Sequence, residues 1–266
     1  MGSHNLAKCL VCADDYGHSF ETNAAIRELL EAGVVNATTC LVEGDSWEAD
    51  GPRLRELVAR GRSVSIGLHL NLTEQLSAGG REPVSPMWLS LDRSIEFADK
   101  LYERFLGQWD AYVRIAGAQP DFIDGHQHVH LAPAARAALF RLVERVGFQG
   151  WIRQCRTSSS RGSAKRLILD RLSDVLAAAA RARNLQCNPG FGGLRSFHQH
   201  EDVLALWTRD LAGMRQGGVL MVHPGAHVHA DPIGKCRVQE ASLLRFLPAI
   251  VREFGLTLQW DVRSGW

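Results

Sequence analysis

The alternation of short apolar runs with longer helical segments is the feature that most constrains the fold of this chain. Runs rich in β-branched and other apolar residues are separated by segments in which apolar side chains recur every three or four positions. This order is typical of βα units packed around a parallel sheet. It predicts an α/β fold with seven or eight parallel strands, at residues 9–13, 38–42, 64–70, 122–125, 151–155, 185–188, 219–222 and 256–260.

Helical periodicity fills most of the intervals between these strands. The predicted helices cover residues 22–32, 54–60, 95–115, 134–146, 165–183, 201–215 and 239–254. Gly33 stands where a helix-ending glycine belongs, and Pro133 stands where a proline opens a helix. Residues 73–91 contain Gly, Pro and Ser without a clear period, which predicts a long loop. This loop follows a strand end, where barrel enzymes keep their specificity loops.

The composition indicates one folded domain. The 266 residues are 45% hydrophobic and 22% charged, and no linker or repeat divides them. We therefore expect a single domain over residues 1–266 and exclude a disordered chain. Residues 1–5 include Gly2-Ser3-His4, and we interpret them as an expression-tag remnant or a disordered start.

Charge and hydropathy limit the kinds of partner. The formal net charge is +1 without a basic stripe, which argues against nucleic acid and anionic membranes. No apolar run is long enough to span a membrane, and the start lacks the pattern of a signal peptide. We therefore expect a cytoplasmic protein that acts on a small molecule. A homodimer is expected only because it is the commonest oligomer.

The six cysteines are too sparse for a disulfide scaffold, so reduced thiols are expected. Cys9 and Cys12 form a C-x-x-C motif inside the first predicted strand. That spacing places the two side chains on opposite faces of the strand, so they cannot hold a metal together. Both are predicted to pack in the core.

Polar residues able to do chemistry stand at the ends of four predicted strands. Taken alone, each has an ordinary structural explanation, such as a helix cap or a buried histidine. In a parallel α/β fold, however, these strand ends meet at one edge, and two imidazoles with one carboxylate form an open metal site. The strand-end residues are Asp14, Asp15, His69, His126 and His223.

Adjacent side chains on an extended backbone point in different directions. One aspartate of the Asp14-Asp15 pair can therefore bind metal while the other faces the water that the metal activates. In DGHQHVH, His126, His128 and His130 alternate and so could share one side of an extended segment. His126 is the predicted ligand. We expect His128 to contact substrate or to have a structural role, and His130 to lie in a loop or at the entry of the helix before Pro133.

These motifs resemble those of the YdjC-type carbohydrate deacetylases, which include chitooligosaccharide deacetylases. The resemblance rests on ADDYG, GVVNATTCLVEG, IGLHLNLTE, DGHQHVH and MVHPG, in the same order and at similar spacing. It implies a deformed (β/α) TIM-like barrel and one divalent metal, Mg²⁺ by the resemblance or Zn²⁺ by ligand softness. Tyr16 replaces the commoner Phe, Gln127 occupies a position that varies in the family, and AHVHADP follows HPG. The last of these departures leaves the substrate end open. The resemblance implies Asp15, His69 and His126 as ligands, Asp14 as general base and His223 as general acid.

Further residues are expected to contact the substrate. Arg153 orients Asp14 through a bidentate pair, contacts substrate oxygens or lies at the surface. A backbone N–H near Gly192 or Gly193 would hold an oxyanion. The glycine-containing turn there would let a sugar approach the backbone closely. Trp88, in the predicted loop, would stack on a sugar face.

The sequence thus predicts a metal-dependent hydrolase that removes N-acetyl groups from a small amino sugar or oligosaccharide. A divalent cation would polarise the acetamide carbonyl and activate water, Asp14 would take a proton, and His223 would protonate the leaving amine. A metal-dependent phosphoesterase is one alternative, although it would need a second metal and more carboxylates than are found. A non-catalytic, metal-stabilised sugar-binding protein is the other.

Overall fold

In the computed structural model, the described part of the chain forms nine parallel strands with helices around them. The structure describes residues 6–78, 80–85, 89, 91–92, 94–157, 164–198, 200–214, 216–226 and 231–258. The strands are β1 (Ala7–Tyr16), β2 (Ala37–Cys40), β3 (Ser65–Leu70), β4 (Phe122–Gly125), β5 (Trp151–Ile152), β6 (Gln186–Cys187), β7 (Phe191–Gly192), β8 (Gly218–Val222) and β9 (Leu256–Thr257).

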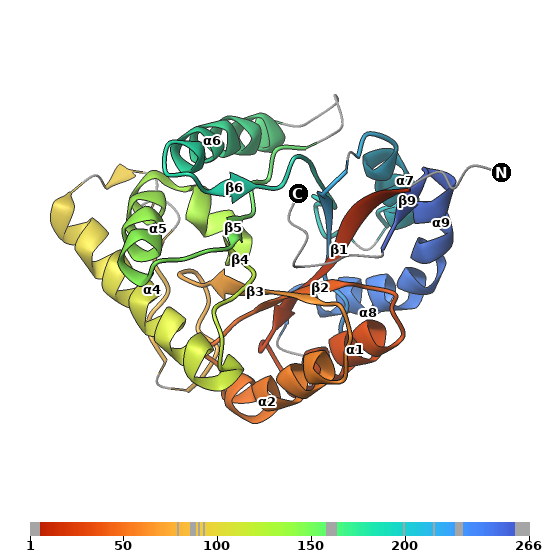
Figure 1. Cartoon of the computed structure of the whole chain (residues 1–266), viewed down its shortest axis with the longest axis horizontal. Coiled ribbons are helices and arrows are strands. Elements are labelled where there is room, and N and C mark those ends of the chain that lie inside the picture. Colours follow the sequence, from red (N-terminus) through yellow and green to blue (C-terminus); the bar gives the residue numbers. More distant parts are fainter. Residues whose placement is uncertain are drawn as a thin grey trace.

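The helices lie around the outside of the curved sheet (Figure 1). They are α1 (Phe20–Glu31), α2 (Asp45–Ala59), α4 (Ile95–Ala116), η1 (His126–Leu131), α5 (Pro133–Val146), α6 (Ala164–Arg181), α7 (Val203–Ala212), α8 (Gly234–Leu243), η2 (Leu244–Phe246) and α9 (Leu247–Glu253). None of the helices described is long and apolar enough to cross a membrane.

The strand order confirms the predicted α/β fold. The sheet runs β6-β5-β4-β3-β2-β1-β8-β7, β9 pairs with β1, and every strand pairing described is parallel. An isolated parallel bridge between Thr157, beyond β5, and Phe191 of β7 brings the two arms of the sheet together. The result is a deformed barrel in which the carboxyl ends of the strands face one mouth.

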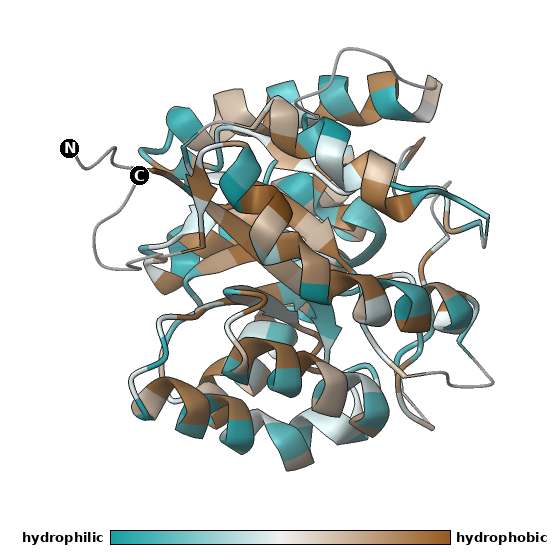
Figure 2. Cartoon of the chain, turned by 90° about the vertical axis from the view of Figure 1, so that its right-hand side faces the viewer, coloured by the Kyte–Doolittle hydropathy of each residue, from teal (hydrophilic) through white to brown (hydrophobic). Residues whose placement is uncertain are grey.

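The core follows from the two covered faces of this sheet. A strand packed on both faces is apolar along its length, and Cys9, Leu10, Val11, Cys12 and Ala13 of β1 are all inaccessible to solvent. Figure 2 shows the same pattern, with brown apolar strands inside and mixed teal and brown helices outside. Both cysteines of the C-x-x-C motif therefore pack in the core, and all six cysteines are free thiols.

Local signals place several helix ends correctly. Gly33 follows α1 with a φ of 69°, a conformation that glycine adopts without strain, and Pro133 is the first residue of α5. Other boundaries differ from the prediction. Helix α2 begins at Asp45 and runs through Pro52, and residues 234–253 form α8, η2 and α9, in which Pro248 lies at the start of the last helix. The two-residue strand β7 was not predicted.

Candidate active site

One cavity collects the polar residues that follow the strands. Its volume is about 650 Å³, within the usual range for small-molecule sites. It lies at the carboxyl ends of β1, β3, β4 and β8 and the chain after β5, because parallel strands all end on the same side of the sheet. Seven residues predicted from the sequence line it: Asp14, Asp15, His69, His126, His128, Arg153 and His223.

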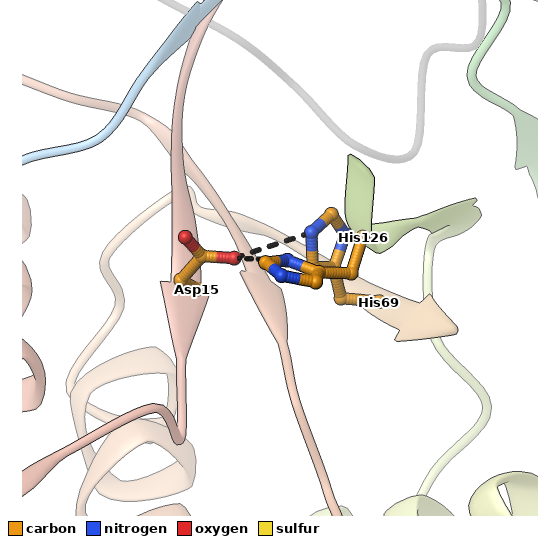
Figure 3. Close-up of side chains that lie close together, drawn as sticks. All are labelled: Asp15, His69 and His126. Atoms are coloured by element: carbon orange, nitrogen blue, oxygen red, sulfur yellow. Dashed lines mark hydrogen bonds and ion pairs between the residues drawn. The ribbon is translucent and has the colours of Figure 1, made fainter. Parts of the chain in front are cut away.

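Asp15, His69 and His126 form a buried donor set. Oδ1 of Asp15 lies 3.3 Å from Nε2 of His69 and 3.0 Å from Nδ1 of His126 (Figure 3). One ligand atom from each residue lies within 4.8 Å of the others, and all three residues are buried. Two imidazoles and one carboxylate suit a divalent cation and leave coordination positions for water and substrate. The residues therefore fit the predicted metal site.

Two of these three side chains, His69 and Asp15, are held by a further residue outside the donor set. Nδ1 of His69 lies 2.6 Å from Oδ1 of Asp124, its neighbour in the β3–β4 register. Nη2 of Arg237 donates to Oδ2 of Asp15 at 2.7 Å, which leaves Oδ1 toward the histidines. Outer partners of this kind orient metal ligands and fix histidine tautomers.

The carboxylates around the site change the pKa values of its groups. Burial opposes the charge on His69, but the nearby Asp124 and Asp15 outweigh it and raise the pKa of His69 to about 10. Burial likewise opposes the charge on His126, while Asp15 and Glu74 raise its pKa to about 9. For Asp15, burial is opposed by Arg237 and His126, which hold its pKa well below the ordinary value. Cation binding requires neutral imidazole and must therefore displace protons.

The backbone separates the two adjacent aspartates. Asp15 has a φ of 73°, in the left-handed region that non-glycine residues seldom adopt, and the β1–β2 register shifts between Ala13 and Tyr16. Gly17 continues this turn at a φ of 100°, where an added Cβ would lie 2.0 Å from the carbonyl oxygen of Leu41. The aspartates diverge as predicted, but through this strained turn and not through extended backbone.

Asp14 is paired with Arg153. Nη1 and Nη2 of Arg153 donate to Oδ1 and Oδ2 of Asp14, each at 2.7 Å. Nη2 also lies 2.5 Å from Oδ2 of Asp124. Asp14, His69 and Asp124 form a second group of donor atoms that could hold a metal, but the guanidinium of Arg153 bridges its two carboxylates. Of the roles left open for Arg153, the structure has the bidentate pair with Asp14, and the side chain is buried and not at the surface.

His223 also lies near Asp14. Its Nε2 is 4.0 Å from Oδ2 of Asp14, and its ring meets the Phe197 ring edge-on at 5.0 Å. The backbone N–H of His223 donates to Glu240 at 2.5 Å, and Glu240 is held in turn by Arg195 at 2.6 Å. Burial lowers the pKa of His223, although the carboxylates of Asp15 and Asp14 partly oppose this.

The prediction that residues 126–130 form an extended segment is wrong. They form the short helix η1, with left-handed φ values of 50° at Gln127 and 62° at His128. His128 still lines the cavity, with Nδ1 3.4 Å from Sγ of Cys155. His130 lies in η1 just before α5, which agrees with the helix-entry alternative, and it is buried, with Nε2 donating to the carbonyl oxygen of Arg153 at 2.8 Å. It therefore supports the backbone of Arg153.

Gly192 does not line the cavity with the other predicted residues. It pairs with Leu220 in the sheet, and a Cβ at this position would lie 2.8 Å from Cβ of Asp210, so the close approach is to α7 and not to a sugar. The N–H of Gly193 already donates to Asp210 at 2.9 Å and is not available to an oxyanion. Trp88 lies outside the described residues.

Three residues with direct contacts to the predicted ligands were missed in the sequence: Glu74, Asp124 and Arg237. Asp124 could have been found, because it lies opposite His69 when the β3 and β4 motifs are aligned in parallel register. Glu74 lies in the predicted functional loop, but no pattern marks it within that loop. Arg237 belongs to α8, 222 residues from its partner Asp15, and local sequence gives no sign of the contact.

Comparisons with known proteins agree with this geometry. The chain is 28% identical over 232 residues to a chitooligosaccharide deacetylase of Salmonella typhimurium, covering 81% of this chain and 80% of the relative. It is 26% identical over 261 residues to a carbohydrate deacetylase of Mus musculus, covering 86% and 81%. A solved structure from Enterococcus faecalis, described as a proposed cellobiose-phosphate cleavage protein, has the same fold, with a TM-score of 0.68, 18% identity and coverage of 98% and 99%. The YdjC-like protein family matches residues 8–246, and the chain belongs to this family.

Proposed function

We propose that this protein is a metal-dependent carbohydrate deacetylase that hydrolyses the N-acetyl group of a small amino sugar or oligosaccharide. The observation that carries the proposal is the juxtaposition of the Asp15, His69 and His126 donor set with Asp14 and His223 in one cavity. The carbohydrate deacetylases among the relatives support the same reaction class.

Asp15, His69 and His126 would hold one divalent cation, Mg²⁺ or Zn²⁺. Such a cation polarises a carbonyl oxygen and lowers the pKa of bound water to about 7. Asp14 is the general base that takes the proton of the attacking water. Because Arg153 holds both oxygens of Asp14, the carboxylate keeps a fixed position for this transfer.

His223 is the general acid for the leaving amine. Its lowered pKa leaves the resting ring neutral at neutral pH, so it must gain a proton during the reaction. Oδ2 of Asp14 is 4.0 Å from Nε2 of His223, beyond direct hydrogen-bond distance, so a proton taken from water would pass from Asp14 to His223 through a bridging water. His223 then gives that proton to the nitrogen as the C–N bond breaks, which yields acetate and the free amine.

The cavity wall suits an N-acetylated sugar. Both apolar and polar side chains line the cavity, so a methyl group and sugar hydroxyls can both find partners. The apolar residues are Leu169, Leu194, Phe197, Met221, Pro232 and Ile233. A cavity of about 650 Å³ has room for a mono- or disaccharide but is too small to enclose a polymer.

The phosphoesterase alternative is disfavoured by Arg153. Two-metal phosphoesterases hold two cations about 4 Å apart on shared carboxylates. Here the second carboxylate pair, Asp14 and Asp124, already binds the guanidinium of Arg153. The guanidinium of Arg153 therefore occupies the carboxylates that a second cation would need.

The test is acetate release from a panel of N-acetylated sugars. Metal-stripped protein is incubated with Mg²⁺, Zn²⁺, Mn²⁺ or Co²⁺ and with N-acetylglucosamine, N,N′-diacetylchitobiose or longer chitooligosaccharides, with nitrophenyl phosphate in parallel. We expect acetate and free amine in equal amounts with at least one metal, and no phosphate release. Binding of the sugars by calorimetry without acetate from any of them would instead support the non-catalytic sugar-binding alternative.

A further inference from the structure

Glu74 joins the loop after β3 to the predicted metal ligand His126. It lies in the connection between β3 and α4, at the end of the NLTE stretch, and it lines the cavity. Its Oε2 lies 2.8 Å from Nε2 of His126. None of the roles in the proposed reaction uses this carboxylate.

The two nitrogens of His126 face different carboxylates. Nδ1 lies 3.0 Å from Oδ1 of Asp15, on the side of the donor set, whereas Nε2 faces Glu74. A ligand imidazole that donates its second N–H to a carboxylate has a fixed tautomer and ring orientation. His69 has the same arrangement, with Asp124 on its second nitrogen.

Glu74 is itself restrained by a second contact. Its other oxygen, Oε1, lies 3.2 Å from Nε2 of His18, in the turn between β1 and α1. The side chains of His126 and His18 are each only 10% exposed, and that of Glu74 is 29% exposed. The largely buried rings of His126 and His18 therefore fix the position of the Glu74 carboxylate, although Glu74 lies on a loop.

We propose that Glu74 is a positioning residue for the metal ligand His126, and that through it the loop after β3 contributes to cation affinity. This inference rests on the proposed metal site. Glu74 acts on His126 as Asp124 acts on His69, but it comes from a loop and not from a strand. Residues that hold metal ligands in this way typically contribute about 10- to 100-fold to metal affinity.

The test measures Co²⁺ binding directly. Metal-stripped wild type, Glu74→Ala, Glu74→Gln and Glu82→Ala are titrated with Co²⁺ by calorimetry and by visible absorption. Glu82 is the matched control, because it is an exposed glutamate of the same loop and its only contact described is through its backbone carbonyl oxygen. Thermal melting of each metal-stripped variant separates a loss of fold from a loss of cation binding.

We expect Glu74→Ala to bind Co²⁺ about 10- to 100-fold more weakly with an altered absorption spectrum, and Glu74→Gln to lose less because it keeps the length of the side chain and an oxygen beside Nε2. Glu82→Ala should match wild type in both measurements. If Glu74→Ala destabilises the metal-stripped fold, the isosteric Glu74→Gln variant decides. Wild-type affinity and spectrum in both Glu74 variants would overturn the inference.

The proposed function fails separately from this inference. Wild-type protein that binds Co²⁺ yet releases no acetate from any N-acetylated sugar contradicts the deacetylase proposal, while the Glu74 comparison still decides the role of Glu74. Wild-type protein that binds no Co²⁺ contradicts the metal site and this inference together.

Discussion

Arg153 and Asp14 form a bidentate ion pair with both N···O distances at 2.7 Å and with neither side chain more than 1% exposed. Arginine presents two parallel donors to a carboxylate, a geometry that lysine cannot reproduce. Asp14 is therefore held in one orientation beside the predicted metal site. Because Arg153 also contacts Asp124, which holds His69, it links the base to the ligand set.

Arg153→Lys should keep the charge but lose the bidentate fixation of Asp14. We expect kcat to fall about 10²-fold, since a misplaced catalytic group costs that much, while bound metal stays near wild type. Steady-state kinetics with metal analysis checks this. An unchanged kcat in a folded, metal-loaded variant would contradict the role of Arg153 in fixing Asp14.

Asp14→Asn and Asp15→Asn should fail in different ways. Asp15→Asn removes the anionic ligand, so we expect weak metal retention and a smaller rise of Tm on metal addition. Asp14→Asn should retain metal and substrate affinity but lose about 10²- to 10⁴-fold in turnover. Metal analysis and kinetics of both variants decide, and an empty site in Asp14→Asn with a full one in Asp15→Asn would reverse the assignment.

Metal binding should release protons from the histidines. With pKa values of about 10 for His69 and about 9 for His126, both rings are charged in metal-stripped protein at neutral pH. Calorimetry in buffers of different ionisation enthalpy should detect release of about two protons per cation near neutrality, and less at higher pH. No proton release at neutral pH would show that the rings are already neutral.

The same shifts predict a pH effect on stability without metal. A raised histidine pKa stabilises the fold fully below the ordinary value of 6.5, and this contribution is lost as pH rises through about 9 for His126 and about 10 for His69. Tm of metal-stripped protein should therefore fall over this range more steeply than that of metal-loaded protein, whose ligand rings are neutral throughout. Parallel pH profiles of the two Tm values would contradict the pKa assignment.

Gly192→Ala tests whether Gly192 of β7 packs against α7 and does not contact the substrate. The added methyl would lie 2.8 Å from Cβ of Asp210 and 3.2 Å from Cδ1 of Leu220, so we expect a loss of about 1–3 kcal/mol in the free energy of unfolding. KM of the folded fraction should not change, because Gly192 does not line the cavity. A raised KM at wild-type stability would restore the substrate-contact interpretation.

The part of the site that could be predicted from the sequence consists of residues at or directly after the ends of the strands. Apolar runs locate buried parallel strands, and the residue after each run must lie at the mouth, which is why Asp14, Asp15, His69, His126 and His223 are brought together. The left-handed backbone at Asp15 and in η1 carries no comparable signal, because aspartate, glutamine and histidine adopt it only when the surrounding structure imposes it. Contacts such as that of Arg237 with Asp15 depend on the closure of the whole barrel, and local periodicity contains no information about them.

The most direct test of a metal-dependent deacetylase is reconstitution of chelator-treated protein. After removal of all metal, verified by elemental analysis, acetate release from the best N-acetylated sugar of the panel is measured as cation is added back. We predict no release from the stripped protein and recovery that saturates at one equivalent, as expected for the single Asp15, His69 and His126 site. Full acetate release from verified metal-free protein, or saturation only at two equivalents, would contradict it.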